Sequence, residues 1–195
     1  MPDFFRKETP AEYFKGMVET ALAHQEVNAS ELTTYYVVNM LCGFVQPSAA
    51  DPEESTDEPL AFKLARALET GGTRQKTGLR RVGDSSLFIA GFFSDSLQRK
   101  SVDVDYYAQV GAYAYGSLAR DDYDALAEAY TQLSEQFVGF ADVLTEVSEQ
   151  AALSGDKDVM RLYEKWLRTG SRHAERRLVQ LGIVPNASIG SRFIQ

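Results

Sequence analysis

Charged residues at the start of one predicted helix are the first set that could do chemistry. Arg80, Arg81 and Asp84 lie close together, and the spacing of Arg80 and Asp84 places them on one helix face. Guanidinium groups hold phosphates or carboxylates through paired hydrogen bonds, and a neighbouring acid orients them. One hypothesis is therefore a pocket for a small anionic ligand. The simpler interpretation is a structural ion pair that fixes this helix against its neighbour.

Tyrosines on the next predicted helix, residues 102–120, could complete such a pocket. Tyr106 and Tyr113 share one side of this helix, whereas Tyr107 and Tyr115 lie nearer another. Tyrosine rings line ligand pockets and interfaces while their hydroxyls hydrogen-bond, and they also fill ordinary cores. We therefore add Tyr106 and Tyr113 to the hypothetical ligand site, with core and interface roles as the alternatives.

A basic helix near the C-terminus is the third candidate. Residues 163–185 resemble a helix-turn-helix outline, with Thr169-Gly170-Ser171 as the turn. That resemblance implies DNA contact through the outward side chains Arg172, Arg176 and Arg177. The alternatives are a solvated basic face or a surface that binds an acidic partner.

The same segment contains an arginine and a histidine five residues apart, Arg168 and His173. This spacing is similar to the Arg-x4–6-His motif of HEPN ribonucleases, which are small all-α proteins. The resemblance implies that Arg168 and His173 would be a catalytic pair that cleaves RNA. Thr169 stands where the motif usually has a polar amide or acid, and Gly170 interrupts the helical frame.

The sequence offers few candidate metal ligands and no convincing catalytic nucleophile. The two histidines, His24 and His173, are far apart, and Cys42 lies in an apolar segment, where cysteine behaves as a small hydrophobe. We expect no metal site and no cofactor. With a single cysteine, no signal-peptide-like start and no apolar run near the roughly 20 residues of a membrane span, we expect a cytoplasmic protein.

Charge is divided unevenly along the 195 residues, whose net charge is −8. Residues 1–160 hold 13 Lys/Arg against 26 Asp/Glu, a net charge of −13. Residues 161–195 hold seven Lys/Arg against two Glu, a net charge of +5. The acidic excess argues against a general nucleic-acid binder, but it allows a local basic contact face and a head-to-tail contact between two copies.

Helices are the elements that must position these residues. No proline occurs between Leu60 and Val184, and apolar residues recur at helical spacing throughout. We predict one all-α domain over residues 1–195, a bundle of seven or eight helices. It includes an acidic loop at 46–58, a basic helical hairpin at 157–182 and a tail at 185–195. The predicted helices span residues 10–25, 31–45, 58–70, 74–93, 102–120, 122–154, 157–168 and 172–181.

Two packing features are predicted. Small residues Ala108, Ala112 and Gly116 form a ridge that we expect to contact Gly83 and Gly91 of the preceding helix. The helix at 122–154 would be the longest. Its apolar seam is typical of coiled-coil packing and could form a homodimer; the seam consists of Leu133, Phe137, Phe140, Leu144, Val147 and Ala151.

The sequence favours a non-catalytic helical binding, adaptor or regulatory protein that acts through protein–protein contacts. The first alternative is a binding domain for a small anionic ligand. The second is nucleic-acid contact or RNA cleavage through residues 163–185.

Overall fold

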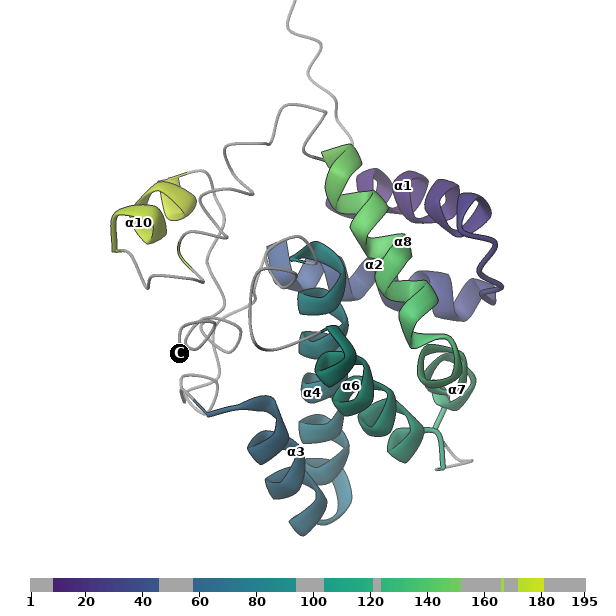
Figure 1. Cartoon of the computed structure of the whole chain (residues 1–195), viewed down its shortest axis with the longest axis vertical. Helices are drawn as coiled ribbons and strands as arrows, with labels where there is room; N and C mark the ends of the chain where they lie inside the picture. Colours follow the sequence, from purple (N-terminus) through teal and green to yellow (C-terminus); the bar gives the residue numbers. More distant parts are fainter. Residues whose placement is uncertain are drawn as a thin grey trace, which may run out of the picture.

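The computed structural model describes residues 9–45, 58–93, 104–120, 124–151, 166 and 172–180. Within these ranges the chain forms eight α-helices and no strand, which confirms the predicted all-α bundle (Figure 1). The helices are α1 (Pro10–His24), α2 (Glu31–Val45), α3 (Leu60–Glu69), α4 (Gly72–Phe92), α6 (Val104–Leu118), α7 (Ala127–Glu135), α8 (Phe137–Ala151) and α10 (Arg172–Gln180).

Local capping starts the first two helices where the sequence predicts. Thr9 and Glu12 form a capping box: the Glu12 carboxylate accepts from the Thr9 N–H at 2.8 Å, and the Thr9 hydroxyl accepts from the Glu12 N–H at 3.3 Å. At α2 the Ser30 hydroxyl accepts from the Thr33 N–H at 3.2 Å. These bonds satisfy backbone donors that a helix N-terminus otherwise leaves without a partner.

The predicted packing of α4 against α6 is confirmed, but only one of the three glycines predicted for this contact lies in it. A Cβ at Gly83 would lie 2.7 Å from the ring of Tyr115 on α6, so this glycine admits that ring. The other predicted glycines face different helices: Gly91 contacts Leu144 of α8, and Gly116 contacts Ser134 of α7. On α6, Gly111 also makes a close approach to α4, because a Cβ there would lie 2.8 Å from the Cβ of Ser86, and it would lie 2.3 Å from the ring of Phe137 on α8.

The predicted single helix at 122–154 was wrong. Its described part forms two helices, α7 and α8, which differ in direction and are separated at Gln136 (Figure 1). The Gln136 side chain donates to the Asn28 carbonyl at 3.0 Å, and the separation lets α7 pack on α2 and α6 while α8 packs on α1 and α4. The whole apolar seam is buried in this chain's own core and is not exposed for a dimer.

The buried residues form one core that draws on every described helix. Its largest fully buried side chains include Tyr115, Phe140, Leu41 and Leu87. In Figure 1, α1, α2, α7 and α8 lie on the right, α4 and α6 run through the middle, and α3 lies at the bottom. Among the helices that the structure describes, none combines enough length with enough apolar character to serve as a membrane span.

Candidate functional sites

The carboxylate of Asp84 lies at the centre of a polar cluster between α2, α4 and α6. The hydroxyls of Tyr36 on α2 and Tyr115 on α6 both donate to its Oδ1, at 2.5 Å and 2.8 Å. Arg80, one turn earlier on α4, places its Nε 3.7 Å from Oδ2. Tyr36 and Tyr115 are 4% and 0% exposed, so Asp84 is the main acceptor for both hydroxyls; that of Tyr115 also lies 3.9 Å from the weakly accepting sulfur of Met40.

Aromatic rings enclose this cluster. Tyr130 of α7 stacks on Tyr115 with ring centroids 6.1 Å apart and meets Tyr36 edge-on at 5.5 Å. The Arg80 guanidinium lies over the Tyr36 ring, 5.3 Å from its centroid. This geometry allows a cation–π attraction. The cluster, which we call the Asp84 cluster, therefore joins four helices through Tyr36, Arg80, Asp84, Tyr115 and Tyr130.

Burial governs the protonation of this cluster. Loss of water raises the pKa of the Asp84 carboxyl, and this effect outweighs the opposing hydrogen bonds from Tyr36 and Tyr115 and the charge of Arg80. Burial and the Asp84 charge raise the pKa of both tyrosines well above 10.0. The hydroxyls thus remain protonated donors. The arrangement fits a structural network whose donors and acceptors are used within the protein.

The other residues of the hypothetical anion site lie elsewhere or contribute differently. Arg81 is partly buried on α4 next to Arg80. Tyr106 uses its hydroxyl oxygen to accept from the Ala61 N–H of α3 at 3.1 Å, and Tyr113 is 48% exposed. The structure therefore brings Arg80 and Asp84 together with Tyr36, Tyr115 and Tyr130 rather than with Tyr106 and Tyr113.

The C-terminal candidates are only partly described. Arg172, His173 and Arg176 are exposed on α10, and Arg177 lies on the same helix. Arg168 and the predicted turn at 169–171 lie outside the described residues, as does residue 181 onward. The RNA-cleaving pair and the helix-turn-helix outline therefore stay predictions.

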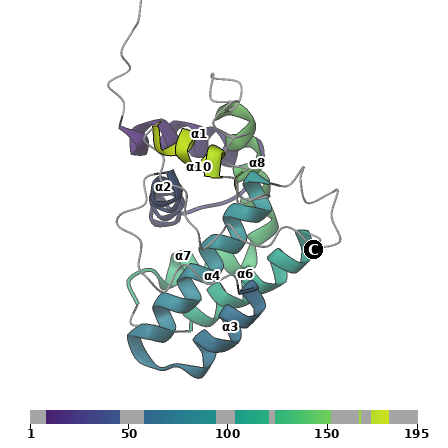
Figure 2. The ribbon, with the colours of Figure 1, turned by 90° about the vertical axis from the view of Figure 1, so that its left-hand side faces the viewer.

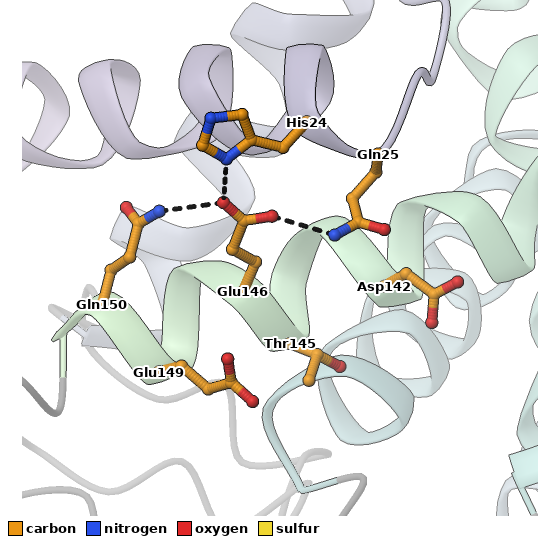
Figure 3. Close-up of a pocket in the computed structure, with 7 residues that line it drawn as sticks. All are labelled: His24, Gln25, Asp142, Thr145, Glu146, Glu149 and Gln150. Atoms are coloured by element: carbon orange, nitrogen blue, oxygen red, sulfur yellow. Dashed lines mark hydrogen bonds and ion pairs between the residues drawn. The ribbon is translucent and has the colours of Figure 1, made fainter.

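A second polar site lies at the surface between α1 and α8, where a hollow of about 540 Å³ opens (Figure 3). We call it the α1–α8 hollow. Its centre is Glu146 of α8, which accepts from three side chains: His24 at 2.7 Å, Gln25 at 2.9 Å and Gln150 at 3.0 Å. The lining residues are His24, Gln25, Asp142, Thr145, Glu146, Glu149 and Gln150.

Charge in the α1–α8 hollow is unbalanced. The hydrogen bonds from Gln25 and His24 lower the pKa of Glu146 below its ordinary 4.5, so this carboxylate is ionised at neutral pH. Asp142 and Glu149 flank it on the same helix and are exposed. Among the described residues neither has an ion pair, and Figure 3 draws neither with a bonded partner. The lining of the hollow thus includes three carboxylates and one imidazole, of which only Glu146 bonds the imidazole.

The chemistry of this lining fits an organic cation. Within the described ranges, no three His, Cys, Asp or Glu side chains gather closely enough to hold a metal ion. Carboxylates and amide oxygens that are spread around an open hollow can instead accept hydrogen bonds from an ammonium or guanidinium group at the end of a long side chain.

Sequence reasoning missed the residues that complete both sites. Tyr36 lies on an apolar helix face, where a tyrosine is normally interpreted as a core residue. Tyr130 lies outside the apolar seam of its segment. His24 and Glu146 are 122 residues apart, and no local pattern links them. In comparisons with protein-family models, curated proteins and solved structures, no match to this chain was found.

Proposed function

We propose that this protein is a non-catalytic helical binding protein of the cytoplasm, and that its α1–α8 hollow receives a basic side chain of a partner protein. One observation carries the proposal: the carboxylates of Asp142 and Glu149 stand unpaired among the described residues, beside an ionised Glu146 in a hollow of about 540 Å³. The single cysteine, Cys42, is a free thiol, which suits a reducing compartment.

A protein side chain suits this hollow better than a typical small molecule. Its volume falls within the roughly 300–1,000 Å³ of ligand pockets, but such pockets are lined mainly by apolar and aromatic side chains. Here every lining residue is polar or charged. Wet, polar contacts at the rim of a protein interface have this character, and a Lys or Arg side chain supplies the missing positive charge.

The Asp84 cluster supports the same proposal by contrast. One oxygen of Asp84 already accepts from two buried tyrosines, and the other faces Arg80. A ligand anion would have to compete with this carboxylate for Arg80 at 3.7 Å. We therefore assign the Asp84 cluster to holding the helices together and the α1–α8 hollow to binding.

The test is a titration with a peptide of defined chemistry. The probe is an acetylated, amidated, alanine-based helical peptide with two arginines four residues apart. On titration into the full chain, backbone amide NMR signals of Gln25, Thr145, Glu146 and Gln150 are expected to shift and saturate. Glu149→Gln is expected to weaken the affinity for the peptide about tenfold, which corresponds to the loss of a charge-assisted hydrogen bond.

Two controls make the titration specific. Glu69→Gln removes an exposed carboxylate on α3, away from the hollow, and is expected to leave the affinity unchanged. A second peptide with glutamine in place of arginine is expected not to bind. Equal affinities for both peptides, or shifts that avoid the hollow, would overturn the proposal.

A further inference from the structure

The helix α10 carries positive charge on its exposed side. Ala174 and Leu178 are fully buried and fix the inward side of this helix. Arg172 and Arg176, which are four residues apart, are exposed on the outward side, and neither has an ion pair with any described residue. Glu175 is also exposed on α10 and reduces this charge without cancelling it. We call this side the Arg172–Arg176 face.

This face lies away from the acidic hollow of its own chain. Figure 1 places α10 at the left of the molecule and α1 and α8 at the upper right. Figure 2, viewed from the left of Figure 1, has α10 in front of α1. The helix that carries the arginines is therefore separate from the two helices that form the hollow. One chain thus displays both a basic donor surface and an acidic acceptor surface.

We propose that the Arg172–Arg176 face of a second copy of this chain docks in the α1–α8 hollow. This inference rests on the proposed function, because it names the partner of the same hollow. Charge complementarity carries it: two unpaired arginines meet the two unpaired carboxylates, Asp142 and Glu149. Such complementarity determines which partner is selected and in what register.

Helix geometry is compatible with this pairing. Arg172 and Arg176 are one turn apart, about 6 Å along the axis, and Asp142 and Glu149 are two turns apart, about 10 Å. Two long, flexible arginine side chains span the difference. The contact is heterologous, because different surfaces of the two copies meet. Two copies either exchange both contacts in a closed pair or continue as an open chain.

The experiment measures self-association of the full chain by sedimentation velocity at low and high salt. Association is expected at ionic strength on the order of 10 mM and is expected to weaken at about 300 mM, where exposed charges are screened. Glu149→Lys and Arg176→Glu are each expected to weaken it about tenfold or more, because each places like charges in contact. Glu175→Gln is expected to strengthen it.

The decisive measurement is sedimentation of a mixture of the two charge-reversal variants, Glu149→Lys and Arg176→Glu. The lysine at position 149 of one chain then faces the glutamate at position 176 of the other, and the unchanged hollow faces an unchanged α10. Association between unlike chains is expected to return to the wild-type level. Glu69→Lys on α3 is the matched control and is expected to associate as the wild type does.

The outcomes separate this inference from the proposed function. A wild-type chain that stays monomeric at low salt, or single variants that associate unchanged, would overturn the docking of α10. Loss of association in both variants without rescue on mixing would overturn it as well. If the arginine peptide still binds the hollow in such a case, the proposed function stands with another partner. If the peptide does not bind while mixing restores association, the docking of α10 stands, and two arginines on a short helix are shown to be insufficient for binding by themselves.

Discussion

Asp84 and Glu146 are two carboxylates with similar hydrogen bonding and opposite consequences. Each accepts from more than one side chain, but Asp84 accepts from buried tyrosines and Glu146 from an exposed histidine and two amides. Burial raises the pKa of Asp84, whereas hydrogen bonds lower the pKa of Glu146. The two side chains are almost equally exposed, at 17% and 16%, so the difference lies in their partners: Asp84 joins buried side chains of other helices, whereas Glu146 lies among polar surface residues. The first network links helices, and the second is the one that we propose to bind a partner.

The largest expected effect comes from removing the buried carboxylate. Asp84→Ala removes the carboxylate acceptor of both Tyr36 and Tyr115 and leaves the Tyr115 hydroxyl only the Met40 sulfur, so we expect the free energy of unfolding to fall by about 3–5 kcal/mol. Urea unfolding followed by circular dichroism measures this change. Asp105→Ala, at an exposed position on α6, is the control and is expected to change it by less than about 0.5 kcal/mol. Equal losses in the two variants would remove the distinction between core and surface.

The two tyrosine hydroxyls are expected to be coupled. Tyr36→Phe and Tyr115→Phe should each lower the free energy of unfolding by about 1–2 kcal/mol, because Asp84 keeps one donor. The double variant leaves Oδ1 with neither tyrosine and should lose about 1 kcal/mol more than the two single losses combined. A double-mutant cycle measures this excess. Strict additivity would show that the hydroxyls act independently and that no shared network exists.

The two carboxylates are expected to give opposite pH dependences. The folded chain holds the Asp84 proton to higher pH than the unfolded chain, so this group's contribution to stability declines as pH rises through its folded pKa. Glu146 contributes stability above its ordinary pKa of 4.5, and this is lost as pH falls through its lowered folded pKa.

Unfolding free energies between about pH 3 and pH 8 test this difference in sign. Asp84→Asn is expected to reduce the decline of the unfolding free energy toward higher pH. Glu146→Gln is expected to reduce its loss toward low pH. The same change of pH dependence in both variants would contradict the predicted opposite signs.

The smallest expected effect on stability is at the hollow. Glu149→Gln removes one of three like charges on neighbouring turns of α8, so we expect a gain of about 0.2–0.5 kcal/mol in the free energy of unfolding. The same variant is expected to weaken the binding of the arginine peptide. Thermal unfolding and the peptide titration, run on one preparation, check both. A clear loss of stability would mean that Glu149 belongs to the fold as Asp84 does.

Local sequence patterns were sufficient to predict the positions of most helices. The capping box at Thr9 and the hydroxyl of Ser30 placed the starts of α1 and α2, because these bonds involve residues only a few positions apart. On α4, Leu79, Val82 and Ile89 recur at helical spacing, and all three are buried. The division between α7 and α8 was missed, because Leu133 and Phe137 are both buried and continue the same apolar pattern across it.

The sites show where local pattern stops being informative. Helical spacing predicted the pair of Arg80 and Asp84 because both lie on one helix. The partners Tyr36, Tyr115 and Tyr130 come from three other helices, and their choice depended on how those helices pack. The same holds for the contact of His24 with Glu146.

By itself, the sequence determined that this chain is helical, where most of its helices lie, and that residues 1–160 and 161–195 carry opposite net charge, since these follow from neighbouring residues and composition. Only the tertiary structure decided which polar groups became buried and which stayed at the surface. The physical reason is desolvation: a carboxylate acts as a structural acceptor at Asp84 and as an exposed charge at Glu149 because of what surrounds it, and those surroundings come from residues distant in the chain.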